Sequence, residues 1–120
     1  MLIVEDDRFL RKACCDGLQR AGYDVTSAED GEEALRKVAA GRPDVILLDW
    51  LVPKVPGVEV LRAVKADARS RDVPVLVLSN STRDEDRERA LELGAAGYLL
   101  KADLSLTDLR TRIEDLLQVS

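Results

Sequence analysis

Two apolar runs in this sequence each end in acidic residues. Residues 45–48 are four consecutive aliphatic residues, and Asp49 follows them directly. Residues 2–4 form a second apolar run, which Glu5 and Asp6 follow at once. Continuous runs of this kind are typical of strands that are buried on both faces of a parallel sheet. Parallel strands deliver the residues after them to one edge of the sheet, where ligands bind in open α/β folds. We therefore expect the three carboxylates to meet at that edge.

The chemistry of three neighbouring carboxylates favours a metal ion. Such groups repel one another unless a cation lies among them. Oxygen ligands with open coordination positions suit Mg²⁺, which keeps several waters and takes only a few carboxylates. A bound metal ion also neutralises the oxygens of an incoming phosphoryl group. Glu5, Asp6 and Asp49 therefore predict a magnesium site. For Asp49 taken by itself, a helix cap or a solvated loop residue is an alternative, because Asp is common in loops.

The composition limits the class of protein. A chain of 120 residues is of ordinary domain size, so we expect a single domain over residues 1–120. The net charge of −5 argues against direct binding of nucleic acid. The absence of His excludes a histidine general base and argues against a transition-metal site. No apolar run is long enough to span a membrane. The adjacent Cys14 and Cys15 fit the core, or its margin, of a reduced cytoplasmic protein.

The elements that must position these carboxylates alternate between strand and helix. The expected strands cover residues 2–5, 24–28, 44–48, 73–78 and 98–100. The expected helices cover residues 7–21, 30–41, 58–66, 83–93 and 105–119. Because crossovers between parallel strands are right-handed, this alternation predicts an α/β fold with five helices on both faces of a doubly wound parallel sheet. Of the two usual strand orders, the flavodoxin-like order 2-1-3-4-5 fits five strands.

The expected helices differ in how firmly their apolar residues should hold them. The first helix should bury Leu10, Cys14 and Leu18 on one face, and Asp7 should cap it. The fourth helix begins with an almost wholly charged segment, so we expect it to be weakly held, mostly exposed and mobile. The fifth helix should bury Leu106, Leu109, Ile113 and either Leu116 or Leu117.

Polar residues also follow the last two expected strands. Ser79 follows the fourth strand, and Lys101 follows the fifth. Together with Glu5, Asp6 and Asp49, they resemble in order and spacing the receiver domain of two-component response regulators. The resemblance covers the whole chain, and it also supports the strand order given above. It is carried by residues 2–7, 44–57, 75–79 and 94–101.

For phosphoryl chemistry, the resemblance implies that Asp49 is the phosphoacceptor. It further implies that Ser79 is the switch hydroxyl, Lys101 the phosphate-binding cation and Tyr98 the switch aromatic. The residue types allow these roles, because an Asp carboxylate can form an acyl phosphate and a cation can neutralise the transferred group. Each residue also has a structural alternative. Ser79 could cap the following helix, Lys101 could be a solvated surface residue, and Tyr98 could belong to the core.

For the metal, the resemblance implies that Mg²⁺ is the cofactor. Glu5 and Asp6 would hold it with Asp49, Asp6 would be a direct ligand, and the backbone carbonyl of Leu51 would be a further ligand. The implied phosphodonor is a sensor histidine kinase or a histidine phosphotransfer protein. Phosphorylation would switch the face made by the fourth helix, the fifth strand and the fifth helix, through which a homodimer could form. We expect no membrane contact, because no apolar run is long enough to span a membrane.

Three features depart from the family's pattern. Ala102 follows Lys101, where the family usually has Pro, often in a cis peptide; a cis bond before Ala is costly, so this loop should differ. Asn80 is bulkier than the small residue that often follows the switch hydroxyl. The loop over residues 51–57 lacks the usual Met and acidic residue.

The residues that should border a hydrolytic water are also informative. In this family they lie two positions after the phosphoacceptor and two after the switch hydroxyl, which here are Leu51 and Ser81. Neither side chain is both long and polar, as it would need to be to position a water, and no His is available as a base. We therefore expect slow loss of the phosphoryl group.

Three other functions are alternatives for a sequence of this kind: a pseudo-receiver, a phosphatase and a flavin protein. A pseudo-receiver, which acts as an interaction or dimerisation module and is never phosphorylated, is compatible with Asn80 and Ala102. An aspartyl-phosphate phosphatase of the haloacid dehalogenase type would need a second Asp at the position of Leu51. A flavin protein of similar fold would need a phosphate-cradling loop after the first strand, where residues 5–7 are acidic and would repel phosphate. We expect a single-domain regulator or a receiver from a longer protein.

Overall fold

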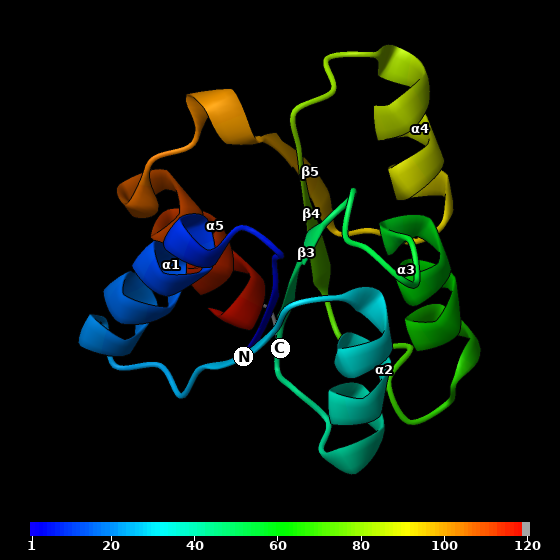
Figure 1. Cartoon of the computed structure of the whole chain (residues 1–120), viewed down its shortest axis with the longest axis horizontal. Helices are drawn as coiled ribbons and strands as arrows, with labels where there is room; N and C mark the ends of the chain where they lie inside the picture. Colours follow the sequence, from blue (N-terminus) through cyan, green and yellow to red (C-terminus); the bar gives the residue numbers. More distant parts are fainter. Residues whose placement is uncertain (119–120) are drawn as a thin grey trace.

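The apolar runs form a five-stranded parallel sheet in the computed structural model, which describes residues 1–118 (Figure 1). The strand order is β2-β1-β3-β4-β5, which confirms the predicted order. Strands β1, β3 and β4 are wholly buried, because helices cover both faces of the sheet. The strands are β1 Leu2–Val4, β2 Thr26–Ala28, β3 Ile46–Asp49, β4 Val75–Ser79 and β5 Gly97–Leu100.

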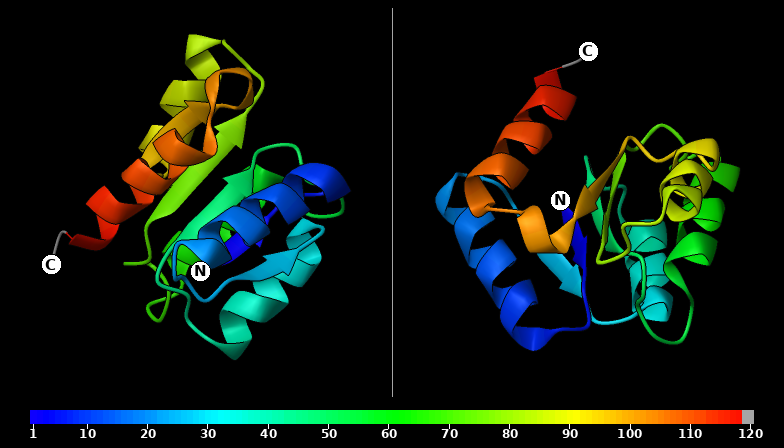
Figure 2. Two further views of the ribbon diagram at one scale, coloured as in Figure 1. Left: turned by 90° about the vertical axis from the view of Figure 1, so that its left-hand side faces the viewer. Right: turned by 90° about the horizontal axis from the view of Figure 1, so that it is seen from above.

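Two layers of helices enclose the sheet. Helices α1 and α5 lie on one face, and α2, α3 and α4 lie on the other (Figures 1 and 2). This arrangement confirms the predicted doubly wound α/β fold. The predicted end of the last helix at residue 119 lies outside the described residues. The helices are α1 Arg8–Arg20, α2 Gly31–Ala40, α3 Gly57–Ala66, α4 Asp84–Glu92 and α5 Leu106–Gln118, and the short 3-10 helix η1 covers Lys101–Asp103.

Alternate residues of the central strands supply the two halves of the core. Leu2 and Val4 of β1 belong to the cluster under α2, α3 and α4, whereas Ile3 belongs to the cluster under α1 and α5. In the second cluster, Cys14 and Leu18 of α1 are buried, as predicted. Burial of a large aliphatic side chain stabilises the fold by about 1.5–3 kcal/mol. The two clusters together therefore hold the strands, and the edge of the sheet that they form, in place.

The ends of the helices nearest the carboxyl edge of the sheet are fixed by side-chain caps. The Asp7 carboxylate accepts hydrogen bonds from the backbone amides of Phe9 and Leu10, as predicted for a cap of α1. Asp30 caps α2 by accepting a hydrogen bond from the amide of Glu33. Each cap satisfies amides that the helix itself leaves unpaired and fixes where the helix begins.

Two expectations about the outer elements were wrong. Leu106 was expected in the core but is 46% exposed; it lies in the first turn of α5, where its side chain lies beside Gly17 of α1. Strand β2 begins at Thr26 rather than at residue 24, because β1 offers only three residues to pair with it. Of the two alternatives in α5, Leu116 packs against the core and Leu117 is exposed.

Helix α4 has the sparse packing that its charged sequence predicted. Ala90 is its single buried residue. Its mobility stays a prediction. In the part of the chain that the structure describes, every helix is too short or too polar to cross a membrane.

Candidate functional site

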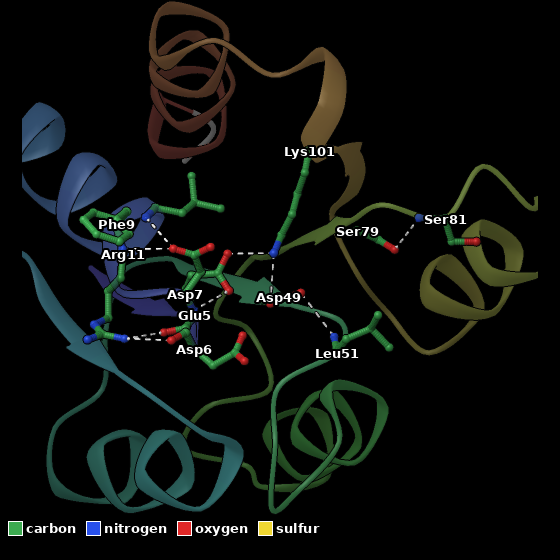
Figure 3. Close-up of polar contacts among 11 residues, drawn as sticks. Glu5, Asp6, Asp7, Phe9, Arg11, Asp49, Leu51, Ser79, Ser81 and Lys101 are labelled. Carbon is green, nitrogen blue, oxygen red and sulfur yellow. Dashed lines mark hydrogen bonds and ion pairs between the residues drawn. The ribbon is translucent and has the colours of Figure 1, made fainter.

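The carboxyl edge of the sheet brings together residues that are far apart in the sequence (Figure 3). Glu5 directly follows β1, Asp49 ends β3, and Lys101 directly follows β5. Strand β3 lies beside β1 and β4 lies between β3 and β5, so the ends of the central strands lie side by side at one edge of the sheet. The adjacent β4 ends in Ser79. The parallel register therefore collects the predicted site residues at one place.

Lys101 bridges two buried carboxylates. Its Nζ lies 2.7 Å from Glu5 Oε1 and 2.9 Å from Asp49 Oδ2. The side chains of Glu5, Asp49 and Lys101 are 2%, 5% and 16% exposed, so Lys101 is not a solvated surface residue. Because an unpaired ion in the interior is strongly destabilising, the loss of any one of these charges would destabilise the protein. The three groups therefore act as one electrostatic unit.

The protonation of the two carboxylates differs. Burial raises the pKa of Glu5 to about 7, and its hydrogen bond with Asp49 adds to the rise, while Lys101 opposes it. Burial by itself would raise the pKa of Asp49, but hydrogen bonds with Glu5, Lys101 and the Leu51 amide hold that pKa below its ordinary value. Burial would lower the pKa of Lys101, but its bonds to both carboxylates outweigh this effect and raise it. The surroundings thus favour the ionised form of Asp49 and the protonated form of Glu5.

The acidic residues have the composition of a magnesium site. One carboxylate oxygen from each of Glu5, Asp6 and Asp49 lies within 4.8 Å of the others. Asp6 is exposed, which leaves room for the waters that Mg²⁺ retains. The amide of Leu51 donates a hydrogen bond of 3.2 Å to Asp49 Oδ1 and holds this oxygen at the start of the loop. The donor set fits Mg²⁺, and the Leu51 carbonyl as a further ligand stays a prediction.

Ser79 and Tyr98 both bind the backbone of Ser81. The buried Ser79 Oγ accepts a hydrogen bond of 3.0 Å from the Ser81 amide, and Tyr98 Oη donates one of 2.9 Å to the Ser81 carbonyl. Ser79 therefore does not cap α4, whose first residue follows Arg83. Tyr98 is half-buried and packs against the core while its hydroxyl reaches this loop. Together the two side chains tie the β4–α4 loop to the sheet edge.

Sequence reasoning missed the central place of Ser81. Its hydroxyl donates a hydrogen bond to Asp86 of α4 and accepts one of 3.2 Å from the Arg83 amide. Ser81 thus joins the end of β4, the start of α4 and the hydroxyl of Tyr98. Ser hydroxyls commonly bind a backbone amide two residues on, and a Ser in the polar segment before a charged helix is the signal that could have indicated it.

A second missed contact supports the loop after Asp49. The Gly31 amide, at the start of α2, donates a hydrogen bond of 3.1 Å to the Pro53 carbonyl. Lys54 has a positive φ of 68° and forms an ion pair of 3.5 Å with Asp30. The loop is therefore docked on the N-terminus of α2, where a carbonyl can approach closely because Gly31 has no Cβ.

The departures noted in the sequence have simple structural outcomes. Residues 1–118 contain no cis peptide bond, and Lys101 begins the 3-10 turn η1 that leads toward α5. The side chain of Asn80 is exposed. Neither position disturbs the contacts among Glu5, Asp49 and Lys101.

Comparison with known proteins agrees with this geometry. Residues 1–114 match the family model of the response regulator receiver domain. The transcriptional regulatory protein PrrA of Mycobacterium tuberculosis is 41% identical over 118 residues, which are 98% of this chain and 49% of PrrA. The phosphate regulon transcriptional regulatory protein PhoB of Escherichia coli K12 is 37% identical over 101 residues, which are 84% of this chain and 44% of PhoB. The chain thus spans about half the length of the curated relatives it matches.

A solved structure supports the same conclusion over nearly the whole chain. The chemotaxis response regulator CheY4 of Vibrio cholerae superposes with a TM-score of 0.90 and 34% sequence identity. The match covers 97% of this chain and 96% of that one. The likeness therefore extends over both layers of helices and the sheet.

Proposed function

The chain belongs to the receiver domain family of response regulators, a family of signalling domains, and on this premise we propose that it accepts a phosphoryl group on Asp49 in a two-component phosphorelay. The observation that carries the proposal is the buried Asp49 carboxylate beside Lys101 and an acidic pair. A sensor histidine kinase or a histidine phosphotransfer protein is the proposed donor, in the cytoplasm.

The proposed transfer exchanges one bond to phosphorus for another. A carboxylate oxygen of Asp49 attacks the phosphorus of a phosphohistidine, and an O–P bond forms as the N–P bond breaks. The electron pair of the broken bond stays on the imidazole nitrogen of the donor. Lys101 Nζ, already 2.9 Å from Asp49 Oδ2, neutralises the charge that arrives with the phosphoryl group. The low pKa of Asp49 keeps the nucleophile ionised.

The acidic residues of the site would hold Mg²⁺ during this step. Glu5, Asp6, Asp49 and the carbonyl of Leu51 are the proposed ligands. When bound, the ion neutralises oxygens of the transferring phosphoryl group. Glu5 and Lys101 are largely buried beside Asp49, and Lys101 bonds to both carboxylates.

The proposed signal leaves the site through the β4–α4 loop. A phosphoryl group on Asp49 adds negative charge near the end of β4 and attracts the hydroxyl of Ser79 and the ammonium of Lys101. If Ser79 turns toward the phosphoryl group, it releases the Ser81 amide that it now binds. Tyr98 holds the same residue, and α4 is lightly packed. The face formed by α4, β5 and α5 then changes its affinity for a partner, which could be a second copy of the chain.

The test of this proposal is phosphorylation by acetyl phosphate and Mg²⁺, followed by the intact mass. The parent protein should gain one phosphoryl group, and Asp49→Asn should gain none. Asp44→Asn is the matched control, because Asp44 is an exposed carboxylate two residues before the start of β3, at the end remote from Asp49. Labelling of the Asp49→Asn protein would reject Asp49 as the acceptor. A folded parent that is never labelled, by acetyl phosphate or by a kinase, would favour the pseudo-receiver.

A further inference from the structure

The guanidinium of Arg11 is directed at the backbone beside the acidic pair (Figure 3). Its Nη1 donates hydrogen bonds to two successive carbonyls, those of Glu5 at 3.0 Å and Asp6 at 3.4 Å. Its Nη2 lies 3.4 Å from Glu29 Oε1, at the end of the neighbouring strand β2. The side chain is only 16% exposed. Arg11 therefore joins the first turn of α1 to the loop that carries both acids.

The other cations of this part of α1 behave differently. Arg8 and Lys12 are exposed, and Lys12 pairs with Asp16 on the same helix. The Glu29 side chain is 68% exposed, so its ion pair with Arg11 is screened by solvent. The two carbonyl contacts are consequently the distinctive feature of Arg11. A charged donor on a carbonyl forms a stronger hydrogen bond than a neutral one.

These contacts bear on where the carboxylates point. The direction of a side chain follows from the orientation of the peptide units on either side of its Cα atom. Glu5 has a second restraint, since its carboxylate binds Lys101. Asp6 is exposed, so little packing holds its side chain, and its direction depends on the backbone that Arg11 holds. A metal ion gains affinity when its ligands are already in place before it binds.

We propose that Arg11 is a positioning residue for the cation site: it holds the peptide units of Glu5 and Asp6 so that their carboxylates face Asp49. This inference rests on the proposed magnesium site. It assigns Arg11 no contact with metal or phosphate. Its effect passes through the backbone of the loop between β1 and α1.

Charge and position make opposite predictions for the loss of Arg11, which makes the inference testable. Removal of a positive charge close to three carboxylates would by itself strengthen the binding of a cation. Loss of a backbone restraint would weaken it. Arg8→Gln removes the same charge from the same helix without touching the carbonyls, so it measures the first effect alone.

The experiment is a Mg²⁺ titration of the parent, Arg11→Gln, Arg11→Lys and Arg8→Gln proteins by calorimetry, with the fluorescence of Trp50 as a second signal. We expect Arg11→Gln to raise the Kd by about tenfold, the lower range for loss of a residue that orients metal ligands. Arg11→Lys should also weaken binding, because an ammonium keeps the charge but cannot reproduce the geometry of the guanidinium. Arg8→Gln should leave the Kd unchanged or lower it. An unchanged or lower Kd for Arg11→Gln would overturn the inference.

Amide hydrogen exchange in metal-free protein separates this inference from the proposed site itself. Exchange in the segment of residues 5–10 should be faster in Arg11→Gln than in the parent and in Arg8→Gln, while the central strands stay protected. Equal exchange in that segment would overturn the restraint by Arg11. A parent that shows no Mg²⁺ binding, or binding that Asp6→Ala leaves unchanged, would instead reject the metal site.

Discussion

The close approach of Gly31 to the loop after Asp49 allows a quantitative test of how the site is supported. A Cβ added to Gly31 would lie 2.0 Å from the Val55 carbonyl oxygen and 2.7 Å from the Val55 Cβ. Distances under 3.0 Å do not occur for real Cβ atoms, so α2 or the loop must move. The nearest atom belongs to the backbone, and a change of side-chain rotamer cannot relieve the contact. Gly31→Ala should therefore displace the loop that carries Leu51.

The expected cost follows from two losses. Overpacking costs about 1–3 kcal/mol, and loss of the hydrogen bond from the Gly31 amide to the Pro53 carbonyl costs about 1 kcal/mol. Replacing Gly by Ala in a helix increases the free energy of unfolding by about 0.5–1 kcal/mol, which offsets part of this loss. The net loss should be about 1–3.5 kcal/mol in the free energy of unfolding. With an unfolding entropy of about 2.1 cal/mol/K per residue, this loss lowers Tm by about 4–14 °C for a chain of this length.

The assay is thermal unfolding followed by circular dichroism, with Gly41→Ala as the matched control. Gly41 follows the other end of α2, and a Cβ added there meets no atom within 4 Å. That variant should stay within about 0.5 kcal/mol of the parent. Adding Val55→Ala to Gly31→Ala should not restore stability, because the carbonyl oxygen remains. Equal Tm values for the Gly31 and Gly41 variants would refute the reasoning.

Two further outcomes are expected at the site. The phosphorylated protein should lose its phosphoryl group slowly, because neither Leu51 nor Ser81 can position a hydrolytic water: the Leu51 side chain is apolar and 73% exposed, and the Ser81 hydroxyl is bound to Asp86. Phosphate release should be faster by about tenfold or more in the Leu51→Asn, Ser81→Glu double variant. Equal rates of release would contradict this prediction. Lys101→Met should lower Tm because it leaves two buried carboxylates without their cation, and Mg²⁺ should raise the Tm of this variant more than that of the parent. An equal rise in the two proteins would mean that Lys101 does not offset the repulsion that Mg²⁺ relieves.

Much of the fold could be predicted because it depends on local patterns. The apolar runs at residues 2–4 and 45–48 have no polar alternation, which indicates strands covered on both faces. Asp7 was recognisable as a helix cap because capping needs only a short side chain next to the first turn. Errors arose where the pattern was weak. Leu106 has the helical spacing of a core residue, but its burial depends on whether another element covers the first turn of α5.

The sequence by itself determined which residues lie at the ends of the central strands, since a strand delivers its next residue to the sheet edge. Tertiary structure alone decided how those residues meet. Lys101 is separated from Glu5 by 96 positions, and their contact of 2.7 Å depends on the strand order, which brings the ends of β1 and β5 to one edge of the sheet. The bonds from Arg11 to the loop carbonyls and the contact of Gly31 with Val55 depend on how α1 and α2 pack. Periodicity reports which face of an element is apolar, but it carries no information about distances between elements, which are set by the packing of the whole core.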